Sequence, residues 1–342
     1  MRALPKFIPV LLLLLLPCIL ATHAQQPTLP DSSNFISYFD RILIKANVST
    51  QSDQYTLIET QGPGLQLRTN NEFKTFLSLD YEFIGFSYGF SPKLLNANND
   101  DYLKGRSSLT DFKLQLLPGQ WLQTLGFRKT RGYYIENTGD FVAGWQKNKD
   151  PYVQLESLTT RQWSGSTSFV FNKDFSFKNL LYQTQWQKRS AGSVVPTLYY
   201  DHSRFAFDYL GTAAEQRDVN LRLGLGYYYT FIIARRFFVS PNLVPAAGIS
   251  FSKSRTTEHN LVSTERKEYY TGFLDGGLKI GFNSAKWVVG AGLNFNANWY
   301  REDTENMVAN SRLFGIVYLG YRFNTPKFIT DTYKAVMSLV PF

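Results

Sequence analysis

The sequence has little of what catalytic and metal sites are usually made from. Its 342 residues include one cysteine, Cys18, and three histidines. Cys18 lies in an N-terminal apolar block that we expect to be cleaved off, and Pro17 before it and Ile19-Leu20 after it argue against a lipid-modified cysteine. The mature chain would then have no thiol for a disulfide or a metal. No histidine spacing matches a metal motif either, so the sequence predicts no cofactor.

The N-terminus has the three parts of a secretory signal peptide. Arg2 and Lys6 precede the apolar block, and Thr-His-Ala at 22–24 follows it as a small-x-small cleavage site. We expect residues 1–24 to be removed and residues 25–40 to form a periplasmic linker. Without Arg2 and Lys6 the chain keeps 34 basic and 27 acidic residues, a net charge of +7.

The chain also lacks long hydrophobic runs and has few charges. After residue 24 no window stays apolar for the roughly 18 residues that a membrane helix needs. Charged residues make up 18% of the chain, whereas aromatic residues make up 16%. This composition favours one β-barrel in an outer membrane over soluble domains. The basic residues are scattered, which fits contact with outer-membrane lipids and lipopolysaccharide and argues against a nucleic-acid partner.

Residues 285–300 show most clearly how side chains alternate in this sequence. Every second side chain is apolar, from Trp287 to Trp299, and those between are small or carry amides, such as Asn294 and Asn296. A period of two is that of a β-strand, whose successive side chains point to opposite faces. At a tilt of about 35–45°, the run between the tryptophans spans roughly 30 Å, close to the apolar thickness of a membrane. The pattern predicts a transmembrane strand with Trp287 and Trp299 in the interfacial aromatic girdles.

The same alternation recurs over residues 41–324. It predicts an all-β fold, a transmembrane antiparallel up-and-down β-barrel of about 12 strands, within a range of about ten to fourteen. The extended runs are one too many for an even barrel, so we expect one N-terminal run to merge with another or not to span. Two hairpins are predicted, one joining 107–117 to 121–130 and one joining 162–171 to 175–188.

Loop lengths set the expected topology. Residues 193–200 could be a further strand or part of a loop. As part of a loop, they leave every long connection on one side, which is simpler because these barrels have short periplasmic turns and long external loops. The expected external loops are then 92–106, 131–160, 189–217, 252–268 and 301–311.

Ten polar or charged residues occupy predicted inward-facing positions. They are Asp80, Glu82, Gln183, Gln185, Gln187, Arg222, Asp275, Lys279, Asn294 and Asn296. Such residues could line a charged pore that selects solutes. A narrow barrel also fills its lumen with amides and paired charges that satisfy one another, and we favour this second interpretation.

The closing strand of the barrel is predicted near residue 323. Large apolar side chains alternate from Gly315 up to Phe323, which is typical of the strand that the outer-membrane barrel assembly machinery recognises. The residues that carry this signal are Gly315, Leu319, Tyr321 and Phe323. Phe342 competes for the role, but Pro341 beside it favours Phe323. Residues 325–342 would then form a periplasmic tail.

The sequence offers one candidate for catalysis. Only His202 and His259 remain after removal of the predicted signal peptide, and Tyr200-Asp201-His202-Ser203 groups an acid, a histidine and a serine. Some barrel enzymes place such residues at the outer rim to cleave esters or peptides. Adjacent residues of an extended chain point to opposite faces, so Asp201 cannot orient His202 unless the chain folds back. We therefore expect His202 to be a solvated loop residue.

Several phrases spread in order over the chain resemble one family of outer-membrane proteins. They are YFDRILIK from Tyr38, KGRS from Lys104, RGYYIEN from Arg131, FNKDFS from Phe171 and KRSAGS from Lys188. Together they resemble the Bacteroidota family catalogued as domain of unknown function 4421. The sequence departs from that pattern at residues 68–70, where an aromatic residue and a proline are expected before the asparagine. The resemblance implies a β-barrel in the outer membrane of a Gram-negative bacterium, with no assigned activity.

The sequence thus predicts a noncatalytic outer-membrane barrel that is structural or a narrow passage for small or amphipathic solutes. The alternative is a lipid-acting barrel enzyme that uses His202 and Ser203. A second alternative is an adhesion or partner-binding barrel that acts through its external loops, above all 131–160 and 189–217.

Overall fold

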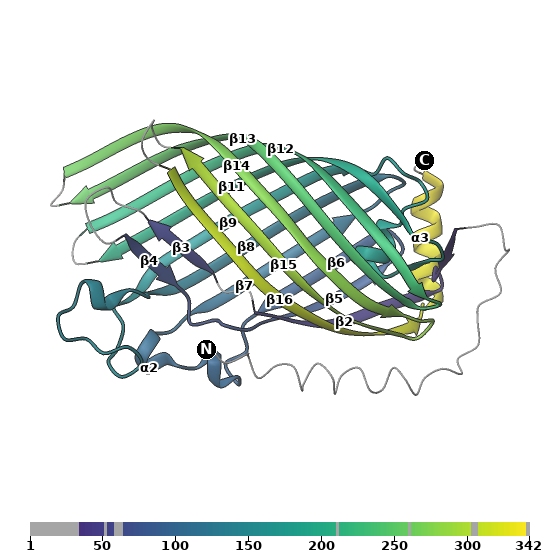
Figure 1. Ribbon diagram of the computed structural model, residues 1–342, viewed down its shortest axis with the longest axis horizontal. Helices are drawn as coiled ribbons and strands as arrows, with labels where there is room; N and C mark the ends of the chain where they lie inside the picture. Colours follow the sequence, from purple (N-terminus) through teal and green to yellow (C-terminus); the bar gives the residue numbers. More distant parts are fainter. Residues whose placement is uncertain are drawn as a thin grey trace.

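Twelve antiparallel strands close into one barrel in the computed structural model (Figure 1). The structure describes residues 34–339 apart from 51–52, 58–63, 210–211, 259–260 and 302–306. The predicted signal peptide and part of the predicted linker lie outside these residues. The prediction of an all-β antiparallel barrel with about twelve strands is confirmed. The strands are β2 (Arg41–Ser49), β5 (Lys74–Tyr81), β6 (Ile84–Phe90), β7 (Ser108–Leu116), β8 (Trp121–Ile135), β9 (Gln154–Phe169), β11 (Ala191–Tyr209), β12 (Thr212–Ala234), β13 (Phe237–Glu258), β14 (Leu261–Asn283), β15 (Trp287–Arg301) and β16 (Met307–Asn324).

Both ends of the described chain lie at one end of the barrel, on the right in Figure 1. We call it the terminal end and the opposite one the far end. The short strand β1 (Phe35–Ser37) and the helix α3 (Lys327–Leu339) are found there, and the ring of Tyr333 on α3 packs against Tyr81 at 5.4 Å between ring centres. Among the described residues, no helix is both long enough and apolar enough to cross a membrane.

The alternation of side chains gives the wall two different faces. On β12, Leu221, Leu223 and Leu225 are exposed on the outside, with fractional exposures of 45%, 66% and 59%. Arg222 and Gly224 between them face the lumen. An apolar outer face suits lipid, and an inner face of polar or small residues leaves room for water or for other parts of the chain.

One predicted hairpin is confirmed and the other is wrong. Strands β7 and β8 pair around a tight turn, in which Gly119 takes a φ of +59° that suits glycine. By contrast, β9 ends at Phe169, and residues 170–190 do not return as a wall strand. They fold as an irregular segment with a π-helical turn, η3 (Lys178–Tyr182), and the short strand β10 (Gln185–Gln187), which pairs with β1.

Several predicted external loops are strands instead. Residues 193–200 belong to β11, and most of 189–217 and 252–268 lies in β11 to β14, which are 19 to 23 residues long. In the predicted loop 131–160, only residues 136–153 lie between strands, namely between β8 and β9. They include the short turn η2 (Thr138–Asp140). Outside a membrane both faces of a strand can be polar, so the hydrophobic alternation that identifies a strand disappears while its backbone ladder continues.

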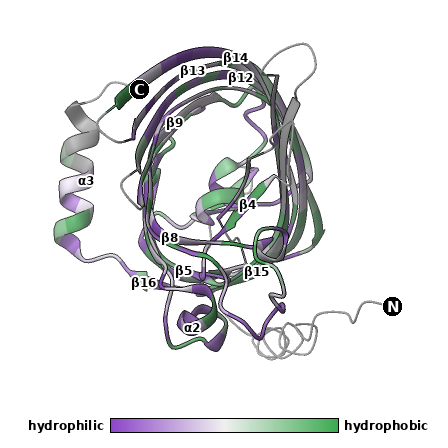
Figure 2. Ribbon diagram, turned by 90° about the vertical axis from the view of Figure 1, so that its left-hand side faces the viewer, coloured by the Kyte–Doolittle hydropathy of each residue, from purple (hydrophilic) through white to green (hydrophobic). Residues whose placement is uncertain are grey.

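The short side of the barrel carries the far-end loops. Strands β5, β6 and β7 have only eight, seven and nine residues. The hairpin of β3 (Gln54–Leu57) and β4 (Leu65–Arg68) folds inside the ring, as Figure 2 shows for β4, and meets β8 at Leu67 and Arg68. The turn η1 (Asn96–Asn98) and the helix α2 (Asp101–Lys104) follow β6.

A buried charge network fixes this short side. Lys74, with no exposed surface, lies 2.9 Å from an Asp53 carboxylate oxygen, and the other oxygen accepts a hydrogen bond from Thr130 at 2.9 Å. Arg128 lies 3.5 Å from Asp53 and 2.7 Å from Asp111. Removing one partner of such a pair leaves an uncompensated buried charge, which costs more than the pair itself contributes.

We expect Asp53→Ala to lower the free energy of unfolding by about 3–5 kcal/mol, because Lys74 would be left buried without its carboxylate. The measurement is urea unfolding of the detergent-refolded barrel. Glu265→Ala, which removes the partner of the more exposed Lys267, is the control and should cost at most about 1 kcal/mol. Equal losses in the two variants would show that the Asp53 network does not stabilise the fold.

Candidate functional site in the barrel lumen

A cavity of about 750 Å³ occupies the far half of the lumen. Its walls come from β3 and β4, from β8 and β9, and from the strands β11 to β15. Viewed from the far end, the strands form a ring around this space (Figure 2). The cavity reaches the far rim, where Ser254 and Glu265 line it.

An arginine and its fixed partners lie in the wall of this cavity. Arg222 on β12 donates through Nη2 to Asp201 Oδ1 at 2.6 Å and through Nη1 to Asn298 Oδ1 at 3.2 Å. Asn220 donates to the second Asp201 oxygen at 2.7 Å. The Arg222 guanidinium also lies 5.6 Å from the centre of the Phe273 ring. These contacts hold the guanidinium in place, since charge-assisted hydrogen bonds are stronger and more directional than neutral ones.

The remaining lining combines balanced charge with hydroxyls, amides and aromatic rings. Basic and acidic lining residues are equal in number, namely Arg128, Arg222 and Lys267 against Asp201, Asp218 and Glu265. The Tyr269 and Tyr300 rings lie 5.1 Å apart, and serines from β9, β11 and β13 also line the cavity. Such a surface offers hydrogen bonds and ring faces without favouring either sign of charge.

The terminal half of the lumen is filled by residues 170–190, which we call the plug segment. Its Phe175, Phe177, Leu180 and Tyr182 are buried and pack against wall residues such as Val195. Gly85 on β6 leaves room for the Tyr182 ring, since a Cβ atom there would lie 2.7 Å from that ring. The plug segment is therefore packed like a core and not lodged loosely in the barrel.

Buried cations of the wall hold the backbone of the plug segment. Lys45 donates to Gln183 Oε1 at 2.7 Å and pairs with Asp80 at 2.9 Å, and Lys279 donates to the Leu180 carbonyl at 3.3 Å. Arg322 donates to the Gln183 carbonyl and, at 2.6 Å, to Asn283 Oδ1. At these three cations the wall supplies the donors, and Leu180 and Gln183 of the plug segment supply acceptors.

A weaker ion pair lies at the edge of the plug segment. Lys178 and Glu82 are 3.9 Å apart, and Glu82 occupies the turn between β5 and β6 with a φ of +51°. Burial lowers the pKa of Lys178 and raises the pKa of Glu82, so desolvation works against the charged forms of both groups.

The ten residues predicted to line the lumen do not form one site. Arg222 and Asn296 line the cavity, and Asn294 lies on the same face of β15 as Asn296. Asp275 shares the inward face of β14 with Lys279. Asp80, Lys279 and Glu82 contact the plug segment or its wall cations, and Gln183, Gln185 and Gln187 belong to the plug segment itself. Placing these three glutamines on a wall strand was wrong, because a short alternating run does not need to span.

The partners of Arg222 were missed by sequence reasoning. Asp201 and Asn298 come from strands that lie 21 and 76 residues away in the chain. A signal for Asp201 exists, because Tyr199, Asp201 and Ser203 alternate on one face and all line the cavity. That signal was hidden by the expectation that these residues belong to a loop.

His202 and Ser203 lie on opposite faces of β11. Ser203 lines the cavity, whereas His202 is exposed on the outer face and stands opposite Trp163 in the ladder. Asp201 faces inward and is bound by Arg222. His259 lies outside the described residues. Within the described part of the chain, no three His, Cys, Asp or Glu residues gather as metal ligands would.

The predicted girdle and closing-strand residues lie as follows. Trp287 and Trp299 are exposed on the outside of β15, with fractional exposures of 42% and 39%. Gly315, Leu319, Tyr321 and Phe323 lie on β16, where Phe323 stands opposite Ile42 of β2. The Trp287 and Tyr321 rings are 4.7 Å apart across the ladder.

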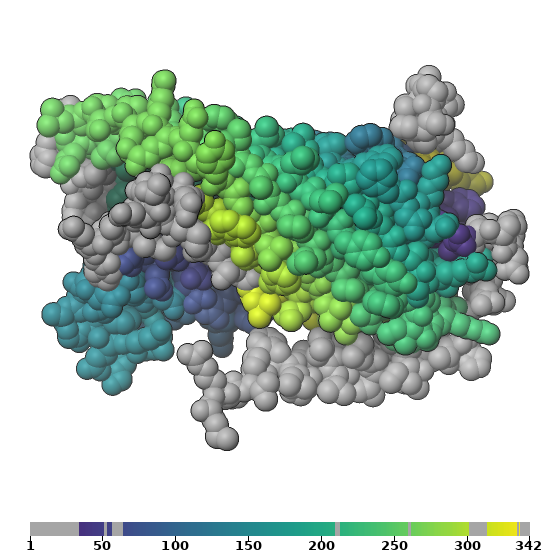
Figure 3. All heavy atoms as spheres, turned by 45° about the horizontal axis from the view of Figure 1, so that its top comes forward, coloured from purple at the N-terminus to yellow at the C-terminus, as the bar shows by residue number. Residues whose placement is uncertain are grey.

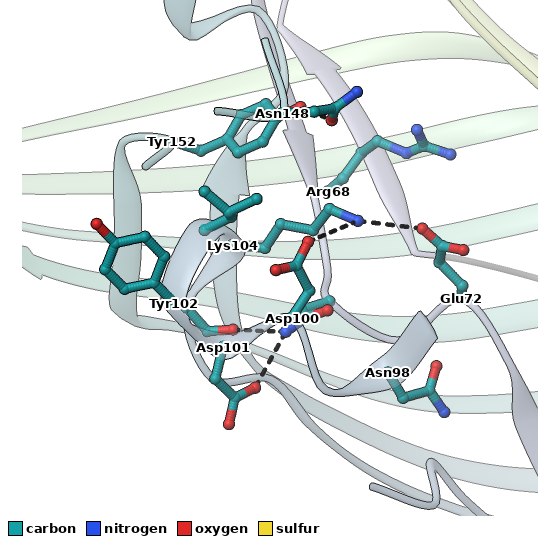
Figure 4. Close-up of polar contacts among 12 residues, drawn as sticks. Arg68, Glu72, Asn98, Asp100, Asp101, Tyr102, Lys104, Asn148 and Tyr152 are labelled. Atoms are coloured by element: carbon teal, nitrogen blue, oxygen red, sulfur yellow. Dashed lines mark hydrogen bonds and ion pairs between the residues drawn. The ribbon is translucent and has the colours of Figure 1, made fainter. Parts of the chain in front are cut away.

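A second group of polar side chains lies at the far end, outside the cavity (Figure 4). Lys104 of α2 reaches Glu72 at 3.2 Å and Asp100 at 3.5 Å. Asn70 donates to Asp101 at 3.0 Å. These contacts tie the chain after β4 to the α2 loop, so the cluster has a clear role in holding two loops together.

A closed ring of twelve antiparallel strands with an apolar outer face and a polar lumen defines the class of outer-membrane β-barrels. Within that class, the chain belongs to the family Domain of unknown function (DUF4421), whose sequence profile matches residues 30–323. The resemblance inferred from the sequence is therefore confirmed. None of the curated proteins is similar enough in sequence to count as a match.

Solved structures of outer-membrane barrels are similar to this chain at low sequence identity. The outer membrane protease OmpT of Escherichia coli has 7% identity and a TM-score of 0.35, with 86% of this chain and 99% of that chain covered. OmpT, an outer membrane protein of Vibrio cholerae, has 6% identity and a TM-score of 0.32, with 87% and 100% covered. Ail, the attachment invasion locus protein of Yersinia pestis, has 14% identity and a TM-score of 0.26, with 60% and 99% covered.

We expect Asp201→Ala to lower the free energy of unfolding by about 1.5–3 kcal/mol, because Arg222 would lose its charged acceptor. Thermal unfolding of the refolded barrel, followed by near-ultraviolet circular dichroism, measures this. Asp218→Ala serves as the control, since among the described residues its carboxylate accepts side-chain hydrogen bonds from the exposed Gln216 alone. A control that melts as early as Asp201→Ala would contradict a fixed Arg222 site.

Proposed function

We propose that the protein is a noncatalytic outer-membrane barrel that gives small polar or amphipathic solutes a narrow passage, closed at rest by the plug segment. The observation that best supports this is the division of the lumen. A cavity lies in the far half beside the β3–β4 hairpin, and the packed plug segment fills the terminal half. With the terminal end in the periplasm, as is usual for such barrels, the cavity faces the outside.

The size and lining of the cavity favour a solute over a purely structural role. A barrel that only supports the membrane needs no space inside it, and small barrels fill their lumen with side chains. About 750 Å³ lies within the range of roughly 300–1,000 Å³ that is typical of small-molecule sites. Equal numbers of basic and acidic lining residues argue against selection of an anion or a cation, so we expect an uncharged polar solute.

The way the plug segment is held favours a passage that can open. The wall holds the plug segment by apolar packing and also by hydrogen bonds from Lys45, Lys279 and Arg322 to backbone or amide oxygens. Such bonds can be replaced by water one at a time. The chain around His202 and Ser203 argues against catalysis, since the two side chains point to opposite sides of the wall.

We expect the refolded mature protein to show low conductance with brief openings in a planar bilayer. The double variant Phe177→Ala, Leu180→Ala removes one aromatic ring and one branched aliphatic side chain that pack the plug segment. It should open more often, because cavities of this kind cost about 2–5 kcal/mol per site. Leu223→Ala, on the outer face, is the matched control and should leave openings unchanged.

Two results would overturn the proposal. If wild type and the double variant are both silent, while the double variant still shows the cold-detergent band shift of a folded barrel, the protein is not a passage. If the wild type is steadily open, the plug segment does not close it.

A further inference from the structure

Basic residues form an unbroken row across the outer face of six neighbouring strands. Each of β8, β9, β11, β12, β13 and β14 contributes one, and each stands directly opposite the next in the hydrogen-bonded ladder. We call them the basic row: Lys129, Arg161, Arg204, Arg217, Lys253 and Arg266. The outer surface of β12 to β14 forms one side of the barrel in Figure 3.

The direction of these side chains follows from their neighbours. Gln216 and Asp218 line the cavity, so Arg217 between them points outward. The same holds for Lys253 between Ser252 and Ser254. Of the basic row, only Arg204 is partly covered, and the other five side chains are exposed.

Such a row costs stability unless an anion covers it. Directly opposed side chains on a sheet have Cβ atoms about 4.5–5.5 Å apart, and like charges at that distance repel. Glu215 pairs with Arg204 at 2.6 Å and also with Arg217. Within the described part of the chain, the other four members have no carboxylate at ion-pair distance. An external anion is the missing partner.

The place of the basic row on the wall favours a lipid head group as that anion. Two residues closer to the terminal end, four of the six strands carry an apolar side chain on the outer face, Phe127, Trp163, Val219 and Phe251, while β11 carries His202 and β14 carries Glu268. The Phe127 and Trp163 rings are 4.5 Å apart. Cations directly above an aromatic and aliphatic belt are where phosphates of a membrane surface lie.

The slope of the basic row distinguishes between kinds of lipid. Strands tilted by about 35–45° and spaced about 4.8 Å apart make a row along the ladder climb roughly 3 Å per strand. From β8 to β14 the climb is therefore roughly 15 Å, more than the roughly 5–8 Å head-group layer of a phospholipid leaflet. A lipid whose anionic groups are spread over several sugars would reach the whole row.

We propose that the basic row binds the phosphorylated saccharide head of lipopolysaccharide in the outer leaflet. The proposal needs the terminal end to be periplasmic, but it does not need the lumen to conduct. The phosphates accept hydrogen bonds from the guanidinium and ammonium groups, and the acyl chains pack on the belt below. Bound lipid offsets the repulsion along the ladder.

The test compares lipid binding by the refolded mature barrel and a triple variant, Arg161→Gln, Lys253→Gln, Arg266→Gln. None of these three has a carboxylate partner among the described residues, so the variant should melt no lower than wild type in lipid-free detergent. Its affinity for purified lipopolysaccharide, measured by thermophoresis, should fall about a hundredfold. Arg189→Gln, Arg235→Gln, Lys286→Gln removes equal charge at the terminal end and should change affinity less than about twofold.

Three outcomes would overturn the proposal. The first is an equal loss in the control variant, which would mean that net charge and not the basic row binds lipid. The second is equal binding of lipopolysaccharide whose phosphates have been removed enzymatically. The third is equal stabilisation of wild type by phosphatidylglycerol, which would make the row a general anionic-lipid surface. A silent planar bilayer would leave this result unaffected, so the two proposals fail separately.

Discussion

Closure of the backbone hydrogen-bond ladder is the constraint on which the structure depends. The hydrocarbon core of a membrane offers no donor or acceptor, so every strand that crosses it needs a hydrogen-bonded neighbour on each side. The pairing of β16 with β2, from Ile316 opposite Ser49 to Asn324 opposite Arg41, meets this need for the first and last strands. Because β2 has only nine residues, the wall is short where the ring closes and long on the opposite side. The far rim is completed by extended strands on one side and by the α2 loop on the other (Figure 1).

Closing twelve strands also creates an interior that must hold either side chains or water. The terminal half is filled by the plug segment, whose aromatic rings replace water and whose backbone carbonyls meet Lys45, Lys279 and Arg322. These cations would be costly inside a barrel without acceptors, since an unpaired buried charge is strongly unfavourable. In the far half Asp201 and Asn298 fix Arg222 beside a cavity instead. Inward-facing residues of the same types therefore line a packed half where the plug segment occupies the lumen, and an open half where it does not.

Sequence patterns predicted the strands of the barrel wall better than they predicted which residues fill the lumen. The strand at 287–301 was recognisable because lipid requires an apolar outer face along its whole membrane length. Residues 201–204 of β11 are polar on both faces, and nothing in their pattern separates a strand above the membrane from a loop. Gln185 and Gln187 alternate as a wall strand does, yet they lie in the plug segment. Arg222 was recognised as lumenal, but its partners depend on the pairing of distant strands, and register cannot be read from one strand alone.

Register also ties the cavity to the outer surface of the barrel. On β13 cavity residues and outer residues alternate, so Ser252 and Ser254 inside the barrel fix Lys253 outside it. A shift of one residue in β13 would place Lys253 in the lumen and would turn Phe251 away from lipid. The burial of apolar side chains in the membrane therefore selects one register. In that register the basic residues of neighbouring strands lie opposite one another. The alignment of the basic row is therefore a consequence of the same ladder that closes the barrel.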